Sequence, residues 1–143
     1  MIQERIAKIK GEFLNFADWE GRYKHLIEMG KDLPKMNEDF KIDANKIKGC
    51  QSQVWLMAEL KDGLVYFHAD SDASIVKGIV ALLVFVYSGA SPEEILSTKP
   101  TFLEEIGLRE HLSMSRANGL TSMLKQISFY AMAFKAQMQM VKN

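Results

Sequence analysis

Apolar residues recur at helical spacing from the start of the chain. Ile2, Ile6, Ile9, Phe13 and Phe16 follow one another at alternating intervals of four and three residues. This spacing places all five side chains on one face of a helix. The pattern therefore predicts an amphipathic first helix.

A second helix is predicted over residues 19–30. Asp18 is a suitable N-cap, and Gly30 lies at the other end, shortly before Pro34. Residues 35–46 mix polar and apolar positions without a period, so we expect a loop there with one short strand approaching residue 50.

The middle of the chain reads as a β-hairpin followed by a buried helix. Residues 53–60 and 64–69 are strand-like, and Asp62-Gly63 between them suits the positive φ angles of a type I′ turn. Residues 73–88 are apolar on nearly every side, which is typical of a helix at the centre of a domain. Ser71 or Asp72 is expected to cap this helix, and Gly89 to end it.

Helices are predicted again in the last third of the chain. Ser91-Pro92-Glu93-Glu94 is a capping box with proline at the first helical position. A long amphipathic C-terminal helix is marked by Leu120, Met123, Leu124, Ile127, Ala131, Phe134, Met138 and Val141. Helices, a short antiparallel sheet and further helices indicate an α+β fold.

Length and composition indicate one globular domain over residues 1–143. Hydrophobic residues make up 48% and charged residues 25% of the chain. Lys+Arg and Asp+Glu both number 18, so no overall positive field attracts nucleic acid, and we expect no nucleic-acid partner.

The same sequence indicates a cytoplasmic protein without a membrane partner. Residues 1–6 are charged and lack the apolar region of a secretory signal. The most apolar stretch, residues 79–87, is much shorter than the ~20 residues of a membrane span. One unpaired cysteine is typical of a reducing compartment.

That cysteine, Cys50, is the strongest candidate for chemistry. A lone thiol closes no intramolecular disulfide, and a structural, inert cysteine is the ordinary interpretation of such a residue. Here, however, the thiol follows Gly49 at a turn and precedes the polar residues Gln51, Ser52 and Gln53. This position favours a reactive thiol over a core cysteine.

A metal site is not predicted. His25, His68 and His111 do not fall at metal-ligand spacing with one another, and one cysteine is too few for a thiolate cage. The nine methionines are scattered or lie on predicted core positions, which favours flexible core packing over a copper site.

Three segments carry a family resemblance. They are Gly49-Cys50-Gln51-Ser52-Gln53-Val54-Trp55, Asp70-Ser71-Asp72-Ala73 with Ile75-Val76-Lys77-Gly78, and Ser115-Arg116-Ala117-Asn118-Gly119-Leu120. In this order and spacing the chain resembles the SufE family of sulfur-acceptor proteins. One departure is Met114, where the family often carries proline.

The resemblance implies a fold and a function. The expected fold is a small three-stranded antiparallel sheet packed against helices, with a long C-terminal helix. The expected function is sulfur transfer: Cys50 accepts persulfide sulfur from a PLP-dependent cysteine desulfurase, stimulates that enzyme, and passes the sulfur to an iron–sulfur scaffold. No cofactor of the chain's own is implied.

The resemblance also implies supporting residues for a sheltered thiol. Gly49, Gln51, Ser52 and Gln53 would shape the thiol loop, and Asp72 and Arg116 would brace it or meet the partner. Arg116 at a helix start is electrostatically unfavourable, and a carboxylate beside it would relieve this. We expect Cys50 to be mostly buried in the free protein.

Three alternatives remain open. A stand-alone cysteine hydrolase or thiol peroxidase would need a base or arginine that lowers the thiol pKa. A cluster scaffold of this fold would need three cysteines, and a purely structural interaction domain would tolerate loss of the thiol.

Overall fold

The sheet of the protein is a single antiparallel hairpin of β1 (Val54–Lys61) and β2 (Leu64–Ser71). The computed structural model describes residues 1–142 and pairs Val54 with Ser71 at one end of the hairpin and Lys61 with Leu64 at the other. Asp62 and Gly63 form the turn with φ angles of 53° and 79°. Both angles are positive, as the predicted type I′ turn requires.

The expected three-stranded sheet is wrong in this chain, because residues 1–142 contain two strands only. The third strand is reduced to one bridge between Lys46 and Trp55, with the Ile47 N–H donating to the Val54 carbonyl at 2.8 Å. Residues before the bridge form two 3₁₀ helices, η1 (Glu38–Phe40) and η2 (Asp43–Asn45). Three residues after Lys46, Gly49 turns the chain with a φ angle of +92°.

Helix α3 (Ser74–Tyr87) forms the centre of the core, as its apolar sequence predicts. It packs against β2 and against α2. The expected N-cap is wrong: Ala73 occupies the cap position, and it offers the helix no side-chain cap. The Ser71 hydroxyl accepts from the Ala73 N–H at 3.3 Å, and the Asp72 carboxylate binds Gln53 instead.

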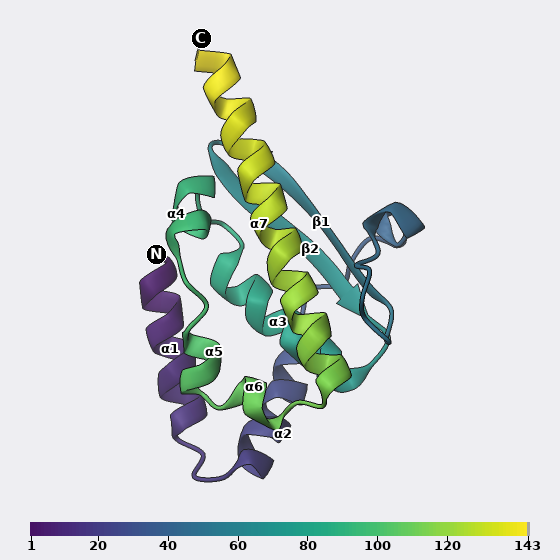
Figure 1. Ribbon diagram of the computed structural model, residues 1–143, viewed down its shortest axis with the longest axis vertical. Coiled ribbons are helices and arrows are strands. Elements are labelled where there is room, and N and C mark those ends of the chain that lie inside the picture. The colour runs from purple at the N-terminus through teal and green to yellow at the C-terminus, as the bar shows by residue number, and fades with distance from the viewer. Residues whose placement is uncertain (143) are drawn as a thin grey trace.

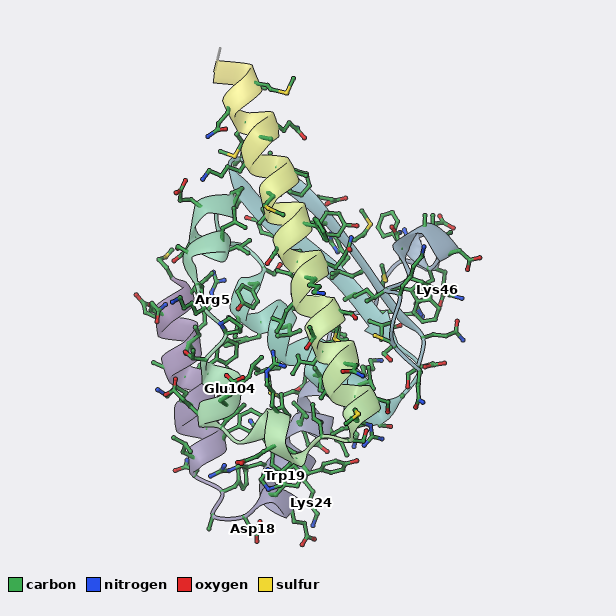
Figure 2. The ribbon with its side chains drawn as sticks, in the orientation of Figure 1. Arg5, Asp18, Trp19, Lys24, Lys46 and Glu104 are labelled. Carbon is green, nitrogen blue, oxygen red and sulfur yellow. The ribbon has the colours of Figure 1, made fainter. Side chains whose placement is uncertain are left out.

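Helices α1 (Ile2–Leu14) and α2 (Trp19–Lys31) confirm the predicted N-terminal pair. Of the five apolar residues predicted to share one face of the first helix, four are buried and the fifth, Phe16, is half-buried. The Asp18 carboxylate caps α2 by accepting from the Gly21 N–H at 2.9 Å (Figure 2). The Arg5 guanidinium ties α1 to the end of α3 through three carbonyls, those of Val86, Ser88 and Gly89, at 3.1, 2.7 and 3.4 Å.

Three short helices follow: α4 (Pro92–Ser97), α5 (Phe102–Glu105) and α6 (Leu108–His111). The Ser91 hydroxyl accepts from the Glu94 N–H at 3.1 Å, which confirms the predicted cap of α4. The Glu94 carboxylate in turn accepts from the Ile2 N–H at 3.2 Å. The capping segment therefore also fastens the start of α1.

The chain closes with α7 (Met114–Lys142), which crosses in front of the hairpin (Figure 1). Its inner face is buried through Leu120, Met123, Ile127 and Ala131. Its C-terminal end projects past the hairpin turn (Figure 1). No helix within residues 1–142 combines the length and the apolar character needed to cross a bilayer.

Candidate thiol site

Cys50 lies in the loop between Lys46, which forms a bridge to Trp55, and the start of β1. The loop rests on the first turns of α7, and the Cys50 thiol donates a weak hydrogen bond to the Gly119 carbonyl at 3.8 Å. Cys50 is half-buried, which is more accessible than the mostly buried thiol expected from the sequence. The side chain is therefore sheltered by α7 but not enclosed.

Two glycines permit this close approach of loop and helix. A Cβ atom on Gly119 would lie 3.2 Å from the Cys50 Sγ, and one on Gly49 would lie 2.8 Å from the Ser122 Oγ. Gly49 also has a positive φ, which other L-residues adopt only with strain. The thiol loop can sit this close to α7 because both positions lack a side chain.

The thiol faces a hollow of about 350 Å³. One wall comes from α3, through Val76 and Ile79, and another from the start of α7. The complete lining is Cys50, Gln51, Ser52, Val76, Ile79, Ser113, Ser115, Arg116, Gly119 and Met123. A small reactant therefore has room beside the sulfur, between an apolar floor and a polar rim.

Burial raises the pKa of the Cys50 thiol above its ordinary value. The cause is desolvation of the half-buried sulfur, which disfavours the charged thiolate. A raised pKa means that the isolated protein holds less thiolate at neutral pH than a free cysteine would. This is the opposite of the lowered pKa that a stand-alone cysteine enzyme requires.

Asp72 secures the end of the thiol loop through Gln53. The Asp72 carboxylate accepts from the Gln53 backbone N–H at 3.0 Å and from the Gln53 side-chain amide at 3.3 Å. The Gln53 carbonyl accepts from the Ser71 hydroxyl at 2.8 Å and from the Asp72 N–H at 3.3 Å. Four hydrogen bonds therefore fix Gln53 to the end of β2, three residues after the thiol.

Arg116 lines the hollow in the first turn of α7 and is exposed. Its backbone N–H donates to the Ser113 hydroxyl at 3.3 Å, so Ser113 caps the helix. The carboxylate partner considered for Arg116 is absent: within residues 1–142 its guanidinium makes no ion pair within 4.0 Å. The guanidinium thus adds an uncompensated positive charge to the rim.

A buried carboxylate network, which the sequence did not predict, lies next to the hydrogen bonds between Asp72 and Gln53, which we call the Asp72–Gln53 clasp. Asp70 is 9% exposed and binds the Lys41 ammonium at 2.7 Å and the Lys77 ammonium at 3.4 Å. Burial alone would raise the pKa of Asp70, but hydrogen bonds from Lys41 and the Ser71 N–H, with the charge of Lys77, lower it overall. The hydrogen bond to Asp70 in turn raises the pKa of Lys41.

The same lysine also faces an aromatic ring. Lys41 and Lys46 place their ammonium groups 5.6 and 5.9 Å from the centre of the Trp55 ring. Figure 2 shows Lys46 beside the 3₁₀ segment, on the outer side of the hairpin. These contacts hold residues 41–46 against β1 and so fix the start of the thiol loop.

The three histidines lie apart and serve separate contacts. His25 binds Glu12, His68 binds Glu59, and His111 stacks on Trp19 with a ring separation of 4.5 Å. Within the part of the chain that the structure describes, no three metal-ligating side chains gather at one place. Among residues 1–142, no histidine lines the hollow beside Cys50.

The fold thus brings most of the candidate residues together. Gly49, Cys50, Gln51, Ser52 and Arg116 surround the hollow or pack against α7 beside it, while Gln53 and Asp72 bind each other just beyond it. Gly119 belongs to one of the three resemblance segments but was not predicted to contact the thiol, although a glycine inside an amphipathic helix is a signal of close packing.

Comparisons with known proteins identify the family of this chain. Residues 7–131 match the family model described as "SufE: Fe-S metabolism associated domain". An uncharacterized SufE-like protein of Synechocystis is 45% identical over 134 residues, covering 94% of this chain and 84% of that protein. An uncharacterized SufE-like protein of Rhizobium meliloti is 43% identical over 129 residues, covering 85% of this chain and 91% of that protein.

A solved structure shares the fold. The solution structure of a hypothetical protein from Thermus thermophilus aligns with a TM-score of 0.76 at 23% identity, covering 90% of this chain and 94% of that one. The family match spans most of the chain and includes the loop of Cys50, the clasp at Asp72 and the start of α7. This chain therefore belongs to the SufE family of proteins associated with iron–sulfur metabolism.

Proposed function

We propose that this protein is a sulfur acceptor and carrier that works with a PLP-dependent cysteine desulfurase. Cys50 takes sulfur from a persulfide on the desulfurase, stimulates that enzyme by clearing its cysteine, and delivers the sulfur to an iron–sulfur scaffold. Membership of a family associated with iron–sulfur metabolism supports this class of function.

The transfer step is a thiolate exchange. The Cys50 thiolate attacks the outer sulfur of the desulfurase persulfide, the sulfur–sulfur bond of that persulfide breaks, and the desulfurase cysteine leaves as a thiolate. The products are a persulfide on Cys50 and a free desulfurase cysteine. One sulfur atom moves between two cysteines, so the step needs no external oxidant or reductant.

The environment of Cys50 is the observation that carries the proposal. The thiol opens on a hollow with space for an added sulfur, yet burial raises its pKa and no histidine of residues 1–142 lines that hollow. Arg116 at the rim does not offset this burial, so the thiol reacts poorly alone and gains by docking against a partner that adds further positive surroundings. A stand-alone cysteine hydrolase or thiol peroxidase, the competing function, needs those surroundings within its own chain.

The neighbouring residues have distinct roles in this proposal. Gln51 and Ser52 form the polar rim beside the sulfur, and Gln53 anchors the loop to Asp72. Arg116 carries a positive charge at the mouth of the hollow, where it attracts the approaching persulfide anion. Release of the Asp72–Gln53 clasp would let the loop move toward the partner.

Mass spectrometry of the intact protein tests the proposal. After incubation with a cysteine desulfurase and cysteine, the wild type should gain the mass of one sulfur atom, and a reductant should remove it. Cys50→Ser should fold normally and gain nothing. Undiminished stimulation of the desulfurase by Cys50→Ser would contradict the carrier role.

A titration of the isolated protein separates the two functions. Alkylation of Cys50 as a function of pH should show a thiol pKa above that of a small free thiol, because burial disfavours the thiolate. A lowered pKa, with hydrolysis or peroxide reduction by the protein alone, would favour the stand-alone enzyme.

A further inference from the structure

The hollow beside Cys50 is much larger than an added sulfur atom requires. Its volume is about 350 Å³. A group the size of a water molecule, such as one sulfur atom, needs about 30 Å³. Pockets that hold small molecules begin at about 300 Å³. One persulfide sulfur therefore uses only a small part of the hollow, whose size is that of a small-molecule site.

The wall that α7 gives to this hollow changes from charged to apolar along the helix. Arg116, Gly119 and Met123 line the hollow and follow one another at intervals of three and four residues, so they share one face of α7. The Cys50 sulfur lies against the middle residue, since a Cβ atom on Gly119 would be 3.2 Å from the Sγ. The sulfur therefore has a guanidinium about one helical turn away on one side and a buried methionine about one turn away on the other.

The rim of the hollow suits a small anion. Among the described residues 1–142, Arg116 is the only charged side chain that lines the hollow, and no carboxylate lines it. The remaining polar lining residues are neutral side chains with hydroxyl or amide donors, namely Gln51, Ser52, Ser113 and Ser115. A carboxylate at the rim therefore meets a cation and hydrogen-bond donors, and no negative charge repels it.

The floor of the hollow suits a short hydrocarbon chain. Val76, Ile79 and Met123 are all buried and apolar. An apolar floor beneath a polar rim matches a ligand with methylene groups and an anionic end. Arg116 begins about 4.5 Å along the helix axis from Gly119, a span that two or three carbon atoms bridge. The hollow therefore fits a small molecule that reacts at the sulfur and ends in a carboxylate at Arg116.

We propose that the hollow binds small thiols that carry a carboxylate two or three carbon atoms from their sulfur, and that Cys50 transfers its persulfide sulfur to them. The inference rests on the proposed carrier function, because the transfer needs a persulfide on Cys50. The carboxylate binds Arg116, the carbon chain lies on the apolar floor, and the thiol meets the persulfide beside Gly119. Small mercapto acids are thus a second class of sulfur recipient besides the scaffold.

The transfer step is a thiol exchange that needs no oxidant or reductant. The thiolate of the small molecule attacks the outer sulfur of the Cys50 persulfide, and the sulfur–sulfur bond of that persulfide breaks. Cys50 leaves as a thiolate, and the outer sulfur keeps its proton. The products are a small-molecule persulfide and the unloaded protein.

The rate of sulfur loss from the loaded protein tests this transfer. The Cys50 persulfide is treated with 3-mercaptopropionate or with 3-mercaptopropionamide, which differ in charge but hardly in size, and the remaining persulfide is followed by intact-protein mass. Each rate is divided by the rate of the same thiol with a small model persulfide, which corrects for the reactivity of the thiol. The corrected rate should be about three- to fivefold higher for the carboxylate, the usual strength of an exposed ion pair.

Two matched variants assign the preference to the rim. Arg116→Gln removes the guanidinium and should abolish the preference for the carboxylate. Lys125→Gln is the control, because it removes the same charge from an exposed position of the same helix, about 13 Å further along and outside the lining of the hollow. The control should keep the preference of the wild type. Incomplete loading of a variant does not affect the comparison, since the rate constant of decay is independent of the amount loaded.

Alkylation of unloaded Cys50 tests the same site without a persulfide. Iodoacetate carries a carboxylate, and iodoacetamide is its neutral counterpart of similar size. Relative to a small free thiol, Cys50 should favour iodoacetate by about threefold, in keeping with one exposed ion pair. Arg116→Gln should lose this preference, and Lys125→Gln should keep it.

The results separate this inference from the carrier function. If the desulfurase loads Cys50 but both thiols remove the sulfur at equal corrected rates, the carrier function stands and the inference is wrong. A preference that survives Arg116→Gln, or that Lys125→Gln removes, also overturns it. If the desulfurase does not load Cys50, the carrier function and the transfer step both fail, and the alkylation preference alone decides whether the hollow binds carboxylates.

Discussion

Two pairs of glycines allow close contacts between segments of this protein, and the two contacts differ in kind. Gly30 and Gly78 lie where α2 crosses α3, and a Cβ on Gly78 would overlap the Leu26 backbone carbonyl. Gly49 and Gly119 lie where the thiol loop meets α7, and a Cβ on Gly119 would press only on the Cys50 side chain. The first contact is backbone against backbone, whereas the second ends on a side chain that can rotate.

This difference predicts that the helix crossing is rigid and that the Cys50 side chain can adjust its position. The helix crossing lies within the apolar core, so neither backbone can retreat without disturbing many neighbours. The thiol loop is held by the weak bond from the Cys50 thiol to the Gly119 carbonyl and by the bonds of Gln53 to Asp72 at its end. At the crossing of α2 and α3, glycine therefore allows a backbone contact that we expect to be fixed. At the thiol loop, glycine leaves room in which the Cys50 side chain can adjust.

The largest effect is expected for Gly78→Ala. The added methyl group collides with backbone that cannot move, so the free energy of unfolding should fall by about 3 kcal/mol. Urea denaturation measures this change. Gly11→Ala is the control, because nothing lies within 4 Å of that position on α1, and the alanine should stabilise the helix by about 0.5 kcal/mol or more. If Gly78→Ala and Gly11→Ala changed the free energy of unfolding equally, the close backbone contact at Gly78 would not be what makes the helix crossing rigid.

Asp70→Asn should come next, because it breaks the network that supports the end of β2. The variant should lose about 2 kcal/mol of stability at pH 7, since Lys41 and Lys77 lose their shared carboxylate. The pKa of Asp70 is lower in the folded than in the unfolded protein, where it is near 3.8. Its stabilisation is therefore fully present above pH 4 to 5 and disappears as the pH falls through the folded pKa.

Urea denaturation at several pH values measures this dependence. The stability difference between wild type and Asp70→Asn should be constant near neutrality and shrink as the pH falls below about 4. A difference that grows on acidification would have the wrong sign and would exclude an ionised Asp70 in the folded protein.

A smaller effect on stability, but a clear one on the thiol, is expected for Asp72→Ala. Asp72 is exposed, so the loss of its bonds to Gln53 should cost less than about 1 kcal/mol. The loop should open more often, and alkylation of Cys50 should become severalfold faster. Asp39→Ala removes another exposed carboxylate from a surface segment and should leave the alkylation rate unchanged.

Gly119→Ala should change stability least. Alanine favours the helix by about 1 kcal/mol, and this gain offsets the cost of displacing the Cys50 side chain. The displaced thiol should be alkylated faster than in the wild type. Unchanged alkylation together with a large loss of stability would show that the thiol loop is as rigid as the helix crossing.

Local signals in the sequence were sufficient for most of the secondary structure. The stripe from Ile2 to Phe13, the cap at Asp18, the turn at Asp62-Gly63 and the apolar helix after β2 all appear in the structure. Each depends on interactions between residues close in the chain, namely helical periodicity, capping hydrogen bonds and positive φ angles. Cys50 likewise stood out from its flanking residues alone.

Contacts between distant residues were decided only by the tertiary structure. The approach of Gly119 to Cys50, the pairing of Lys41 with Asp70, and the reduction of a third strand to the Lys46–Trp55 bridge join positions that no local pattern connects. The direction of the Cys50 pKa shift follows from its burial against α7, which is a product of packing. Sequence alone singled out Cys50 as the candidate thiol, because its flanking residues are local, and only the fold decided how sheltered that thiol is, because its burial comes from packing against α7.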